Sequence, residues 1–210
     1  SGAGKSTIAK LLAAKMNCIY LDTGAMYRTV GLLAVRTNTD RHDDAALAEL
    51  LKNADIRVLR VDGSQHMALG GEDVETLIRT PEISMAASDV ASCPSVRRAL
   101  VALQQKIAAG CDVVMDGRDI GTRVLPDADY KFFLTASDKV RAQRRYDELK
   151  AKGESVTLQE VLEDVRRRDE QDTTRAESPL TIADDATEVE TDDLGIDEVV
   201  TVLMALMGRF

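Results

Sequence analysis

The chain has 210 residues, of which 44% are hydrophobic and 30% charged, and its formal net charge at pH 7 is -9. This composition is that of a globular protein with one domain, or with one domain that carries an insertion. The negative charge argues against general binding to nucleic acids or anionic membranes, and no apolar run approaches the roughly 18 residues that span a bilayer. Three separate cysteines, Cys18, Cys93 and Cys111, favour a reducing compartment, so we expect a cytoplasmic protein.

The first seven residues, Ser1-Gly2-Ala3-Gly4-Lys5-Ser6-Thr7, match the second half of a phosphate-binding P-loop. In such a loop, backbone N–H groups and the N-terminus of the following helix hold phosphates. We expect Lys5 to reach the β- and γ-phosphates of ATP and Ser6 to bind Mg²⁺. A flexible start before an ordinary helix is the alternative, but an apolar stripe begins at once with Ile8, which favours nucleotide binding. Because the motif's first glycine and a preceding strand are not in the sequence, we expect more chain upstream.

Helix and strand patterns alternate through much of the chain, which indicates an α/β fold with a parallel sheet and helices on both faces. A helix is expected over residues 5–16, then a short buried strand over 18–21, then a helix that Thr23 would cap. The capping-box pair Thr157 and Glu160 predicts the start of a later helix. Further helices are expected at 44–53, 82–91, 94–109, 138–152, 157–172 and 196–207, and further strands at 113–115, 130–134 and 187–191.

The segment from about 56 to 78 has a different character. Two short apolar stretches, 56–61 and 67–69, are each followed by a dipeptide typical of tight turns, Asp62-Gly63 and Gly70-Gly71. We therefore expect a small β-rich insertion of antiparallel strands on the α/β core.

Four residues at the end of the first expected strand form a candidate ligand site. Asp22 follows the strand, and open α/β sheets bind ligands at the carboxyl ends of their strands. Thr23 and Tyr27 are four residues apart, so they would share one side of the helix, next to Arg28. The alternative, in which Thr23 is only a cap and Tyr27 only a core residue, stays open on these residues alone.

A second candidate follows the strand at 113–115. The segment Asp116-Gly117-Arg118-Asp119 puts two carboxylates around one guanidinium at the sheet edge expected to hold the P-loop, and Gly121-Thr122-Arg123 comes next. A turn would explain the glycines equally well, but it would not explain the charged residues. We therefore favour a functional site here.

A third candidate lies at the end of the helix that begins near residue 157. Arg168, Asp172 and Arg175 are spaced i, i+4 and i+7, so they would lie on one helical face. Taken alone, this helix is more simply a solvated surface with salt bridges, because it has many acidic neighbours. Beside a P-loop, arginines suit phosphoryl transfer, which needs mainly positioning and positive charge. The helix before it carries three more arginines, Arg141, Arg144 and Arg145.

Together these stretches resemble the bacterial cytidylate kinases, a family of P-loop nucleoside monophosphate kinases. Four segments carry the resemblance, in the family's order and spread over nearly the whole chain: SGAGKST at 1–7, LDTGAMYR at 21–28, DGRDIGT at 116–122 and RDEQDTTRAESPL at 168–180. The P-loop segment is generic, whereas the other three are specific.

The resemblance implies transfer of the γ-phosphoryl group of ATP to CMP or dCMP, with Mg²⁺, by a monomer with a parallel five-stranded core. It implies one P-loop kinase domain over 1–210, N-terminally truncated and without its first strand. The core would comprise 1–36 and 94–210, with a nucleotide-binding insertion at about 37–93 and a mobile lid at about 141–160.

The resemblance also implies roles at matching positions. Residues 1–7 would bind ATP, with Ser6 as the Mg²⁺ ligand. Cytosine offers an N4 amine and the acceptors N3 and O2, which suit a carboxylate and two donors; the matching positions are Asp119, Arg97 and Ser88. The expected catalytic residues are Lys5, Arg118 and Arg175. The other substrate contacts would be Thr23, Tyr27, Arg28, Asp116, Arg168, Asp172 and Arg175, with Arg168 and Asp172 on the sugar side.

Two other functions stay open on the sequence. One is a P-loop kinase for another small acceptor such as UMP, AMP, shikimate or dephospho-coenzyme A, which need not carry the β-rich insertion with Ser88 and Arg97. The other is a non-catalytic nucleotide-binding switch, which would need little of the arginine array.

Overall fold

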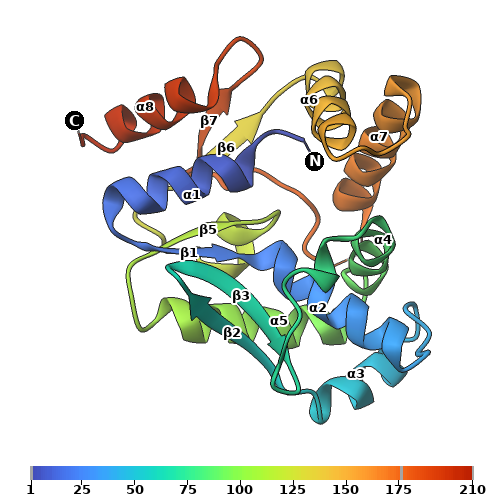
Figure 1. The fold of residues 1–210 in the computed structure, drawn as a ribbon. Coiled ribbons are helices and arrows are strands. Elements are labelled where there is room, and N and C mark those ends of the chain that lie inside the picture. Colours follow the sequence, from blue (N-terminus) through green and yellow to red (C-terminus); the bar gives the residue numbers. More distant parts are fainter. Residues whose placement is uncertain (1, 176, 210) are drawn as a thin grey trace.

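The computed structural model describes residues 2–175 and 177–209 of the chain (Figure 1). All the helices and strands expected from the sequence are present, and the short elements β4, η1 and η2 are additional. In chain order the elements are α1 (Lys5–Met16), β1 (Ile19–Asp22), α2 (Thr23–Arg36), α3 (Asp44–Lys52), β2 (Ile56–Val61), β3 (Ser64–Leu69), β4 (Glu72–Asp73), the 3-10 helix η1 (Leu77–Arg79), α4 (Pro81–Val90), α5 (Pro94–Ala108), β5 (Val113–Asp116), the π-helix η2 (Ile120–Val124), β6 (Phe132–Thr135), α6 (Asp138–Ala151), α7 (Leu158–Thr174), β7 (Thr187–Glu190) and α8 (Ile196–Leu206).

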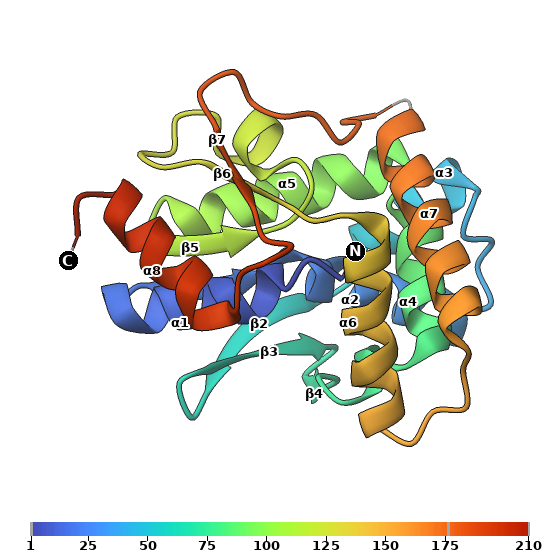
Figure 2. The same ribbon diagram turned by 90° about the horizontal axis from the view of Figure 1, so that it is seen from above.

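The core strands run parallel, in two pairs. β1 pairs with β5, with Ile19 opposite Val113 and Asp22 opposite Asp116, and β6 pairs with β7. Helices α1 and α8 cover one side of these strands, and α2 and α5 lie on the other (Figures 1 and 2). The α/β class with a parallel sheet and helices on both faces is therefore confirmed.

A cavity of about 920 Å³ lies between the two strand pairs. Its walls include Met115 of β5, Phe132 and Leu134 of β6, and Leu12 of α1. The resemblance implied a five-stranded core, but within residues 2–175 and 177–209 the parallel strands number four and the two pairs share no ladder. None of the helices in this part of the chain is both long and apolar enough to cross a membrane.

Asp22, and not Thr23, caps helix α2. Asp22 is extended, and its Oδ1 accepts a hydrogen bond from the backbone N–H of Ala25 at 2.9 Å. A carboxylate suits this position because it satisfies a free N–H group and interacts favourably with the helix dipole. The expectation that Thr23 caps the helix was wrong. Its hydroxyl donates instead to the backbone carbonyl oxygen of Asp116 at 2.7 Å, because the pairing of β1 with β5 brings the two strand ends together.

The expected β-rich insertion is an antiparallel sheet in the order β2-β3-β4, beneath the core strands in Figure 1. Its buried Met67 and Ile78 join the same apolar cluster as Met26 of α2. Helices α2 and α4 cross at very close range, because a Cβ atom at Gly31 would lie 2.9 Å from the backbone nitrogen of Ala87. The insertion is thus packed directly on α2, the helix that Asp22 caps.

Helices α6 and α7 form a pair that packs through a small cluster of buried residues including Ala142, Val161 and Val165. The predicted capping box of Thr157 and Glu160 is present at the start of α7. This helix ends at Thr174, so Arg175 has an extended backbone (φ -61°, ψ 142°). The expectation that Arg175 continues one helical face was therefore wrong.

Candidate functional site

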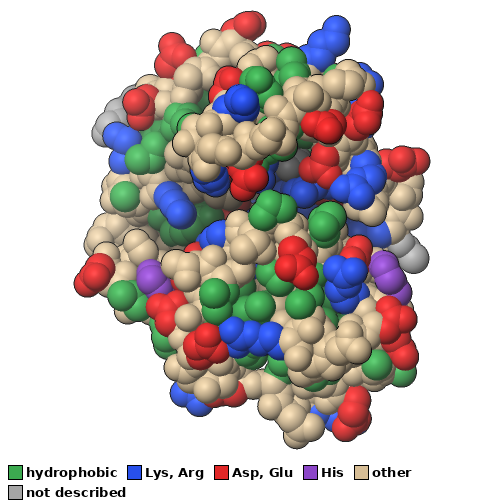
Figure 3. Space-filling model, turned by 45° about the vertical axis from the view of Figure 1, so that its right-hand side comes forward, with side chains coloured by type: hydrophobic (Ala, Val, Ile, Leu, Met, Phe, Trp, Pro, Cys, Tyr) green, Lys and Arg blue, Asp and Glu red, His purple; other side chains and the backbone are tan. Residues whose placement is uncertain are grey.

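A hollow crosses the face of the molecule shown in Figure 3, and lysine and arginine side chains lie on its walls. The P-loop segment comes close to helix α6 here, since a Cβ atom at Gly2 would lie 2.6 Å from the carbonyl oxygen of Arg141. Gly2 and Gly4 have φ of 76° and 73°, the left-handed region that favours glycine. Of the seven expected P-loop residues, Ser1 lies outside the described residues; Ala3 is buried, and Lys5, Ser6 and Thr7 begin α1.

Asp116, at the end of β5, is held by two hydroxyl groups. Ser6 donates to its Oδ2 at 2.6 Å, and the phenol of Tyr20 donates to its Oδ1 at 3.0 Å. Burial, together with the nearby Asp22 carboxylate, raises the pKa of Asp116. Burial also raises the pKa of Tyr20, and the Asp116 carboxylate adds to the shift, so the phenol remains a donor.

Lys5 and Arg118 bring two positive charges to the same place. The Arg118 guanidinium, with burial, lowers the pKa of Lys5 to about 7, while Asp116 and Asp172 oppose the change. Arg118 is oriented by Asp172 of α7, with 2.6 Å between Nε and Oδ2. The loop after β5 and helix α7 thus meet beside the P-loop.

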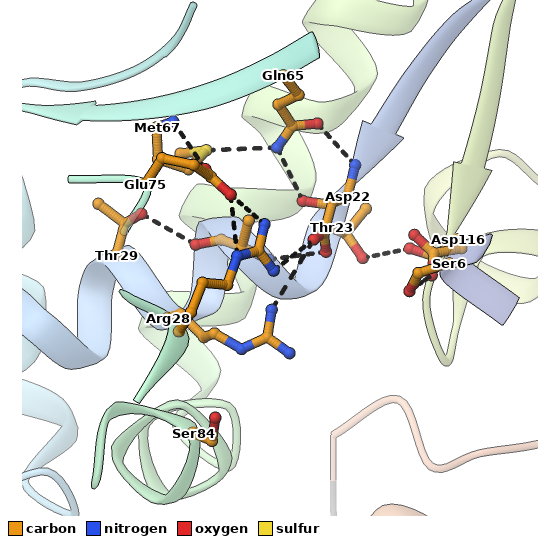
Figure 4. Close-up of polar contacts among 12 residues, drawn as sticks. Ser6, Asp22, Thr23, Arg28, Thr29, Gln65, Met67, Glu75, Ser84 and Asp116 are labelled. Atoms are coloured by element: carbon orange, nitrogen blue, oxygen red, sulfur yellow. Dashed lines mark hydrogen bonds and ion pairs between the residues drawn. The ribbon is translucent and has the colours of Figure 1, made fainter. Parts of the chain in front are cut away.

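On the other side of Asp116 lies the end of β1, shown in Figure 4. The Asp22 carboxylate forms an ion pair with Arg79 at 2.9 Å, and Arg28 Nη1 lies 3.9 Å from the same Oδ2. Arg28 covers the main chain of Gly24, where a Cβ atom would lie 3.4 Å from Nη1. Burial lowers the pKa of Arg28, and the Asp22 carboxylate partly offsets that effect.

Arg97 and Asp119 form a buried ion pair, with exposed fractions of 3% and 6%. Arg97 also donates from Nη1 to the backbone carbonyl oxygen of Ala91 at 3.2 Å, and its guanidinium carbon lies 5.6 Å from the centre of the Tyr27 ring. Burial raises the pKa of Tyr27 to about 12. Within the described residues, the buried Arg97 Nε and Tyr27 Oη have no hydrogen-bond partner, so both can serve a ligand.

Arg175 approaches the same region from the segment after α7. Its Nη1 lies 3.5 Å from Asp172 Oδ1, and its Nε donates to the carbonyl oxygen of Ser178 at 2.7 Å. Its buried Nη2 has no partner among the residues that the structure describes. Burial lowers the pKa of Arg175, with the Arg97 guanidinium as the second cause.

Ser88 and Arg168 both line a smaller pocket of about 220 Å³ between α4 and α7. The Ser88 hydroxyl donates to the carbonyl oxygen of Ser84 at 3.3 Å, and Arg168 pairs with Asp164 at 2.9 Å. Arg168 and Asp172 are both in α7 and share the expected helical face, but Arg168 pairs with Asp164 whereas Asp172 pairs with Arg118.

The predicted residues therefore come together in groups rather than as one cluster. Ser6 meets Asp116, Arg97 meets Asp119, and Arg118 meets Asp172. Ser88 and Arg168 lie at the edge, around the smaller pocket. The prediction did not include four residues that contact the strand ends or their neighbours: Tyr20, Gln65, Glu75 and Arg79. Tyr20 could have been found, because alternate residues of a strand share a face and Asp22 was already a candidate.

This arrangement can bind phosphate groups and neutralise their charge. A glycine-rich turn leads into a helix N-terminus, where Lys5 lies near Arg118, while Arg28 lies beside Asp22 and Arg175 beside Asp172. Within the described residues, no three His, Cys, Asp or Glu side chains cluster as a metal site. A cation shared with phosphate oxygens needs only one or two protein carboxylates, and Asp116 beside the Ser6 hydroxyl offers such oxygen ligands.

Comparisons with known proteins agree with this chemistry. A family model described as Cytidylate kinase matches residues 1–209. A protein named cytidylate kinase from Caldicellulosiruptor bescii is 48% identical over 209 residues, which is 100% of this chain and 92% of the relative. One of the same name from Caldanaerobacter subterraneus subsp. tengcongensis is 51% identical over 95% of this chain and 88% of its own length. A third, from Bacillus velezensis, is 45% identical over 100% of this chain and 93% of its own length.

Proposed function

The chain belongs to the cytidylate kinase family and transfers the γ-phosphoryl group of ATP to CMP or dCMP, and from this premise we propose which residues carry each part of the reaction. The observation that supports the proposal most directly is the meeting of Ser6 with Asp116 beside Lys5 and Arg118. These groups come from the P-loop and from the strand end next to it, where a phosphate donor binds in such folds.

Residues 1–7 bind the ATP phosphates in this proposal, with Lys5 on the β- and γ-phosphates. The support is the left-handed backbone at Gly2 and Gly4, which lets the main chain approach an anion closely, and the α1 N-terminus. Ser1 is included from its place in the motif, since it lies outside the described residues.

Magnesium fits the site formed by Ser6 and Asp116. A hydroxyl and a carboxylate oxygen are hard ligands, and their 2.6 Å hydrogen bond brings both into one place. We propose that these two residues hold the ion with the ATP phosphates. When bound, Mg²⁺ neutralises charge on the phosphate oxygens.

Arg28, Arg118 and Arg175 hold the phosphate of the acceptor, with Thr23 and Tyr27 lining its site. An oxygen of the CMP phosphate attacks the γ-phosphorus of ATP, the bond from that phosphorus to the β–γ bridging oxygen breaks, and ADP leaves. Negative charge spreads over the transferred group meanwhile, so fixed guanidinium groups lower the barrier. The buried, unpartnered Nη2 of Arg175 supports a role toward this group.

Asp119, Arg97 and Ser88 read the cytosine ring. The Asp119 carboxylate can accept from N4 of cytosine, while Arg97 and Ser88 can donate to N3 and O2. The unpartnered Nε of Arg97 and the mutual ion pair of Arg97 with Asp119 support this assignment. Arg168 and Asp172 bind the sugar, and the contact of Asp172 with Arg118 links the sugar side to the phosphate side.

The larger organisation follows the same proposal. Residues 37–93 form the monophosphate-binding insertion, residues 1–36 and 94–210 form the core, and a lid at about 141–160 closes over the two nucleotides. Closure excludes water and so limits hydrolysis of ATP. The enzyme acts as a cytoplasmic monomer.

A coupled assay for ADP release tests the reaction and the base readers together. With Mg-ATP, we expect turnover largely confined to CMP and dCMP in a panel that also contains UMP, AMP and shikimate. Asp119→Ala should narrow the preference for CMP over UMP by roughly tenfold or more, because one good base contact contributes about 1–3 kcal/mol of discrimination. An unchanged preference in a folded Asp119→Ala protein would count against Asp119 as a base reader.

A further inference from the structure

Two residues of the insertion, Gln65 and Arg79, bind Asp22, and a third, Glu75, holds Arg79. We name Asp22, Gln65, Glu75 and Arg79 together the Asp22 clasp. Gln65 of β3 binds the main chain of Asp22 at two points (Figure 4). Its side-chain oxygen accepts from the Asp22 N–H at 2.7 Å, and its amide nitrogen donates to the Asp22 carbonyl oxygen at 3.2 Å. One side chain thus joins the antiparallel insertion to the end of strand β1.

Arg79 holds the Asp22 side chain. Its Nη1 donates to Asp22 Oδ2 at 2.9 Å, and its Nε donates to Glu75 Oε1 at 2.9 Å. Glu75 is itself fixed, because its Oε2 accepts from the N–H of Met67 at 3.2 Å. The planar guanidinium therefore lies between two carboxylates, in a direction set by β3 and η1.

Arg28 shares the carboxylate oxygen that Arg79 holds. The separation of Arg28 Nη1 from Asp22 Oδ2 is 3.9 Å, which is beyond hydrogen-bond distance, while Arg79 is at 2.9 Å. Asp22 Oδ1 is occupied by the N–H of Ala25, so the carboxylate cannot turn to offer Arg28 another oxygen. As a result Arg28 is attracted to Asp22 without being bound by it, and its donors stay available to a phosphate.

We propose that Arg79 is a positioning residue for the acceptor phosphate, because it occupies Asp22 and thereby keeps the Arg28 guanidinium available. This inference rests on the proposed function, which assigns Arg28 to the phosphate of CMP. Without Arg79, Arg28 closes onto Asp22 Oδ2, and phosphate binding then has to break a short ion pair. The loss falls on the phosphate of the acceptor and not on its base or on ATP.

A purely structural role for Arg79 predicts something different, and the chain offers a matched control. Arg36 of α2 also ties the insertion to the core, through two hydrogen bonds to Glu72 of β4 at 2.6 and 3.1 Å. This pair is more exposed than the Asp22 clasp, and no candidate site residue belongs to it. If fastening the insertion were all that Arg79 does, Arg36→Gln and Arg79→Gln would have similar effects.

The test measures binding of CMP and of cytidine by calorimetry, and KM for ATP and CMP by the coupled assay, in the full chain. For Arg79→Gln we expect CMP binding to weaken between roughly tenfold and a hundredfold, the size of effect that misplacing a binding group produces. Cytidine binding and the KM for ATP should stay within about twofold of the starting protein. Arg36→Gln should leave all four quantities unchanged within about twofold.

The double variant shows whether Arg79 acts through Arg28. Adding Arg79→Gln to Arg28→Gln should weaken CMP binding by less than about twofold more. Additive losses would mean that Arg79 contacts the phosphate itself, which overturns the positioning role. The positioning role is also overturned if Arg79→Gln behaves like Arg36→Gln although Arg28→Gln loses CMP binding.

Normal CMP binding by Arg28→Gln would instead remove Arg28 from the proposed function, a separate failure. If Arg79→Gln does not fold, Arg79→Lys replaces it. Lysine keeps the charge near Asp22 but cannot bridge two carboxylates in the same plane, so an intermediate loss of CMP binding is expected. CMP binding equal to the starting protein would then overturn the proposal.

Discussion

Asp22 and Asp116 occupy the same position in two neighbouring parallel strands, yet their surroundings differ. They face each other in the register of β1 and β5, and each is the last residue of its strand. Asp22 is held by a guanidinium and a helix N-terminus, whereas Asp116 is held by two hydroxyl groups. A carboxylate with a fixed positive partner is a structural anchor. One that accepts hydrogen bonds from two neutral hydroxyls, with the Lys5 cation nearby, can take up a further cation.

The difference comes from the elements that pack against each strand end. The insertion supplies Arg79 and Gln65 to β1, and the P-loop supplies Ser6 to β5. The Asp22 carboxylate is therefore held by an ion pair, whereas the Asp116 carboxylate is held by two neutral donors with the Lys5 and Arg118 cations nearby. The comparison predicts that the two carboxylates have different functions. Substituting Asp22 and Asp116 one at a time can separate these functions.

The largest effect is expected for Asp116→Asn. The amide keeps the shape but removes the negative charge next to Ser6, so kcat should fall by roughly 100- to 1,000-fold, as when a key charged or hydrogen-bonding group of an active site is removed. The KM for CMP should change by less than about threefold. The coupled assay at several Mg²⁺ concentrations measures both. Asp112→Asn, near the opposite end of the same strand, is the control, and equal losses in the two variants would contradict this role.

A smaller and different effect is expected for Asp22→Asn. The amide oxygen can still cap α2, but the ion pair with Arg79 is lost, so the free energy of unfolding should fall by about 2 kcal/mol. The KM for CMP should not rise, because Arg28 then has no carboxylate to close onto, and the Mg²⁺ dependence of kcat should not change. Urea melts and the coupled assay measure these quantities. A shifted Mg²⁺ dependence would show that the two acids are not distinct in function.

The smallest effect is expected for Tyr20→Phe, which removes one of the two donors to Asp116. Loss of one hydrogen bond should reduce stability by about 1 kcal/mol and kcat by several-fold, because Ser6 still holds the other oxygen. The ring keeps its contact with Lys10, which lies 5.6 Å from the ring centre. Tyr130→Phe is the matched control, since that phenol donates to the carbonyl oxygen of Met207 far from the strand ends. Steady-state kinetics should therefore show a lower kcat for Tyr20→Phe than for Tyr130→Phe. Thermal unfolding measures the stability of each variant.

Much of this comparison could be predicted from the sequence. The P-loop motif and the rule that ligands bind at the carboxyl ends of parallel strands placed Ser6 near Asp116 without further information. The insertion was visible in the alternating apolar residues and glycine turns. These are local patterns, and local patterns survive folding when the tertiary structure agrees with them.

The contacts made across the insertion could not be predicted. Gln65 and Arg79 lie 43 and 57 positions from Asp22 in the chain, and they meet it only because the insertion docks on α2. The placing of Arg97 and Asp119 at one site likewise came from the family resemblance and not from spacing, and their ion pair was not predicted. The helical spacing wrongly placed Arg175 on the same helical face as Arg168 and Asp172, because α7 ends one residue before Arg175.

The close crossing of α2 and α4 at Gly31 has a consequence for engineering the enzyme. Ser88 follows Ala87, the residue whose backbone nitrogen a methyl group at position 31 would press upon. Enlarging that glycine would displace the backbone next to Ser88, which lines the smaller pocket between α4 and α7, while leaving every side chain of that pocket in its original chemical form. Under the proposed role of Ser88 as a reader of cytosine, a library that aims to accept bulkier or modified pyrimidines can therefore alter the pocket at Gly31 before it changes any residue proposed to contact the base.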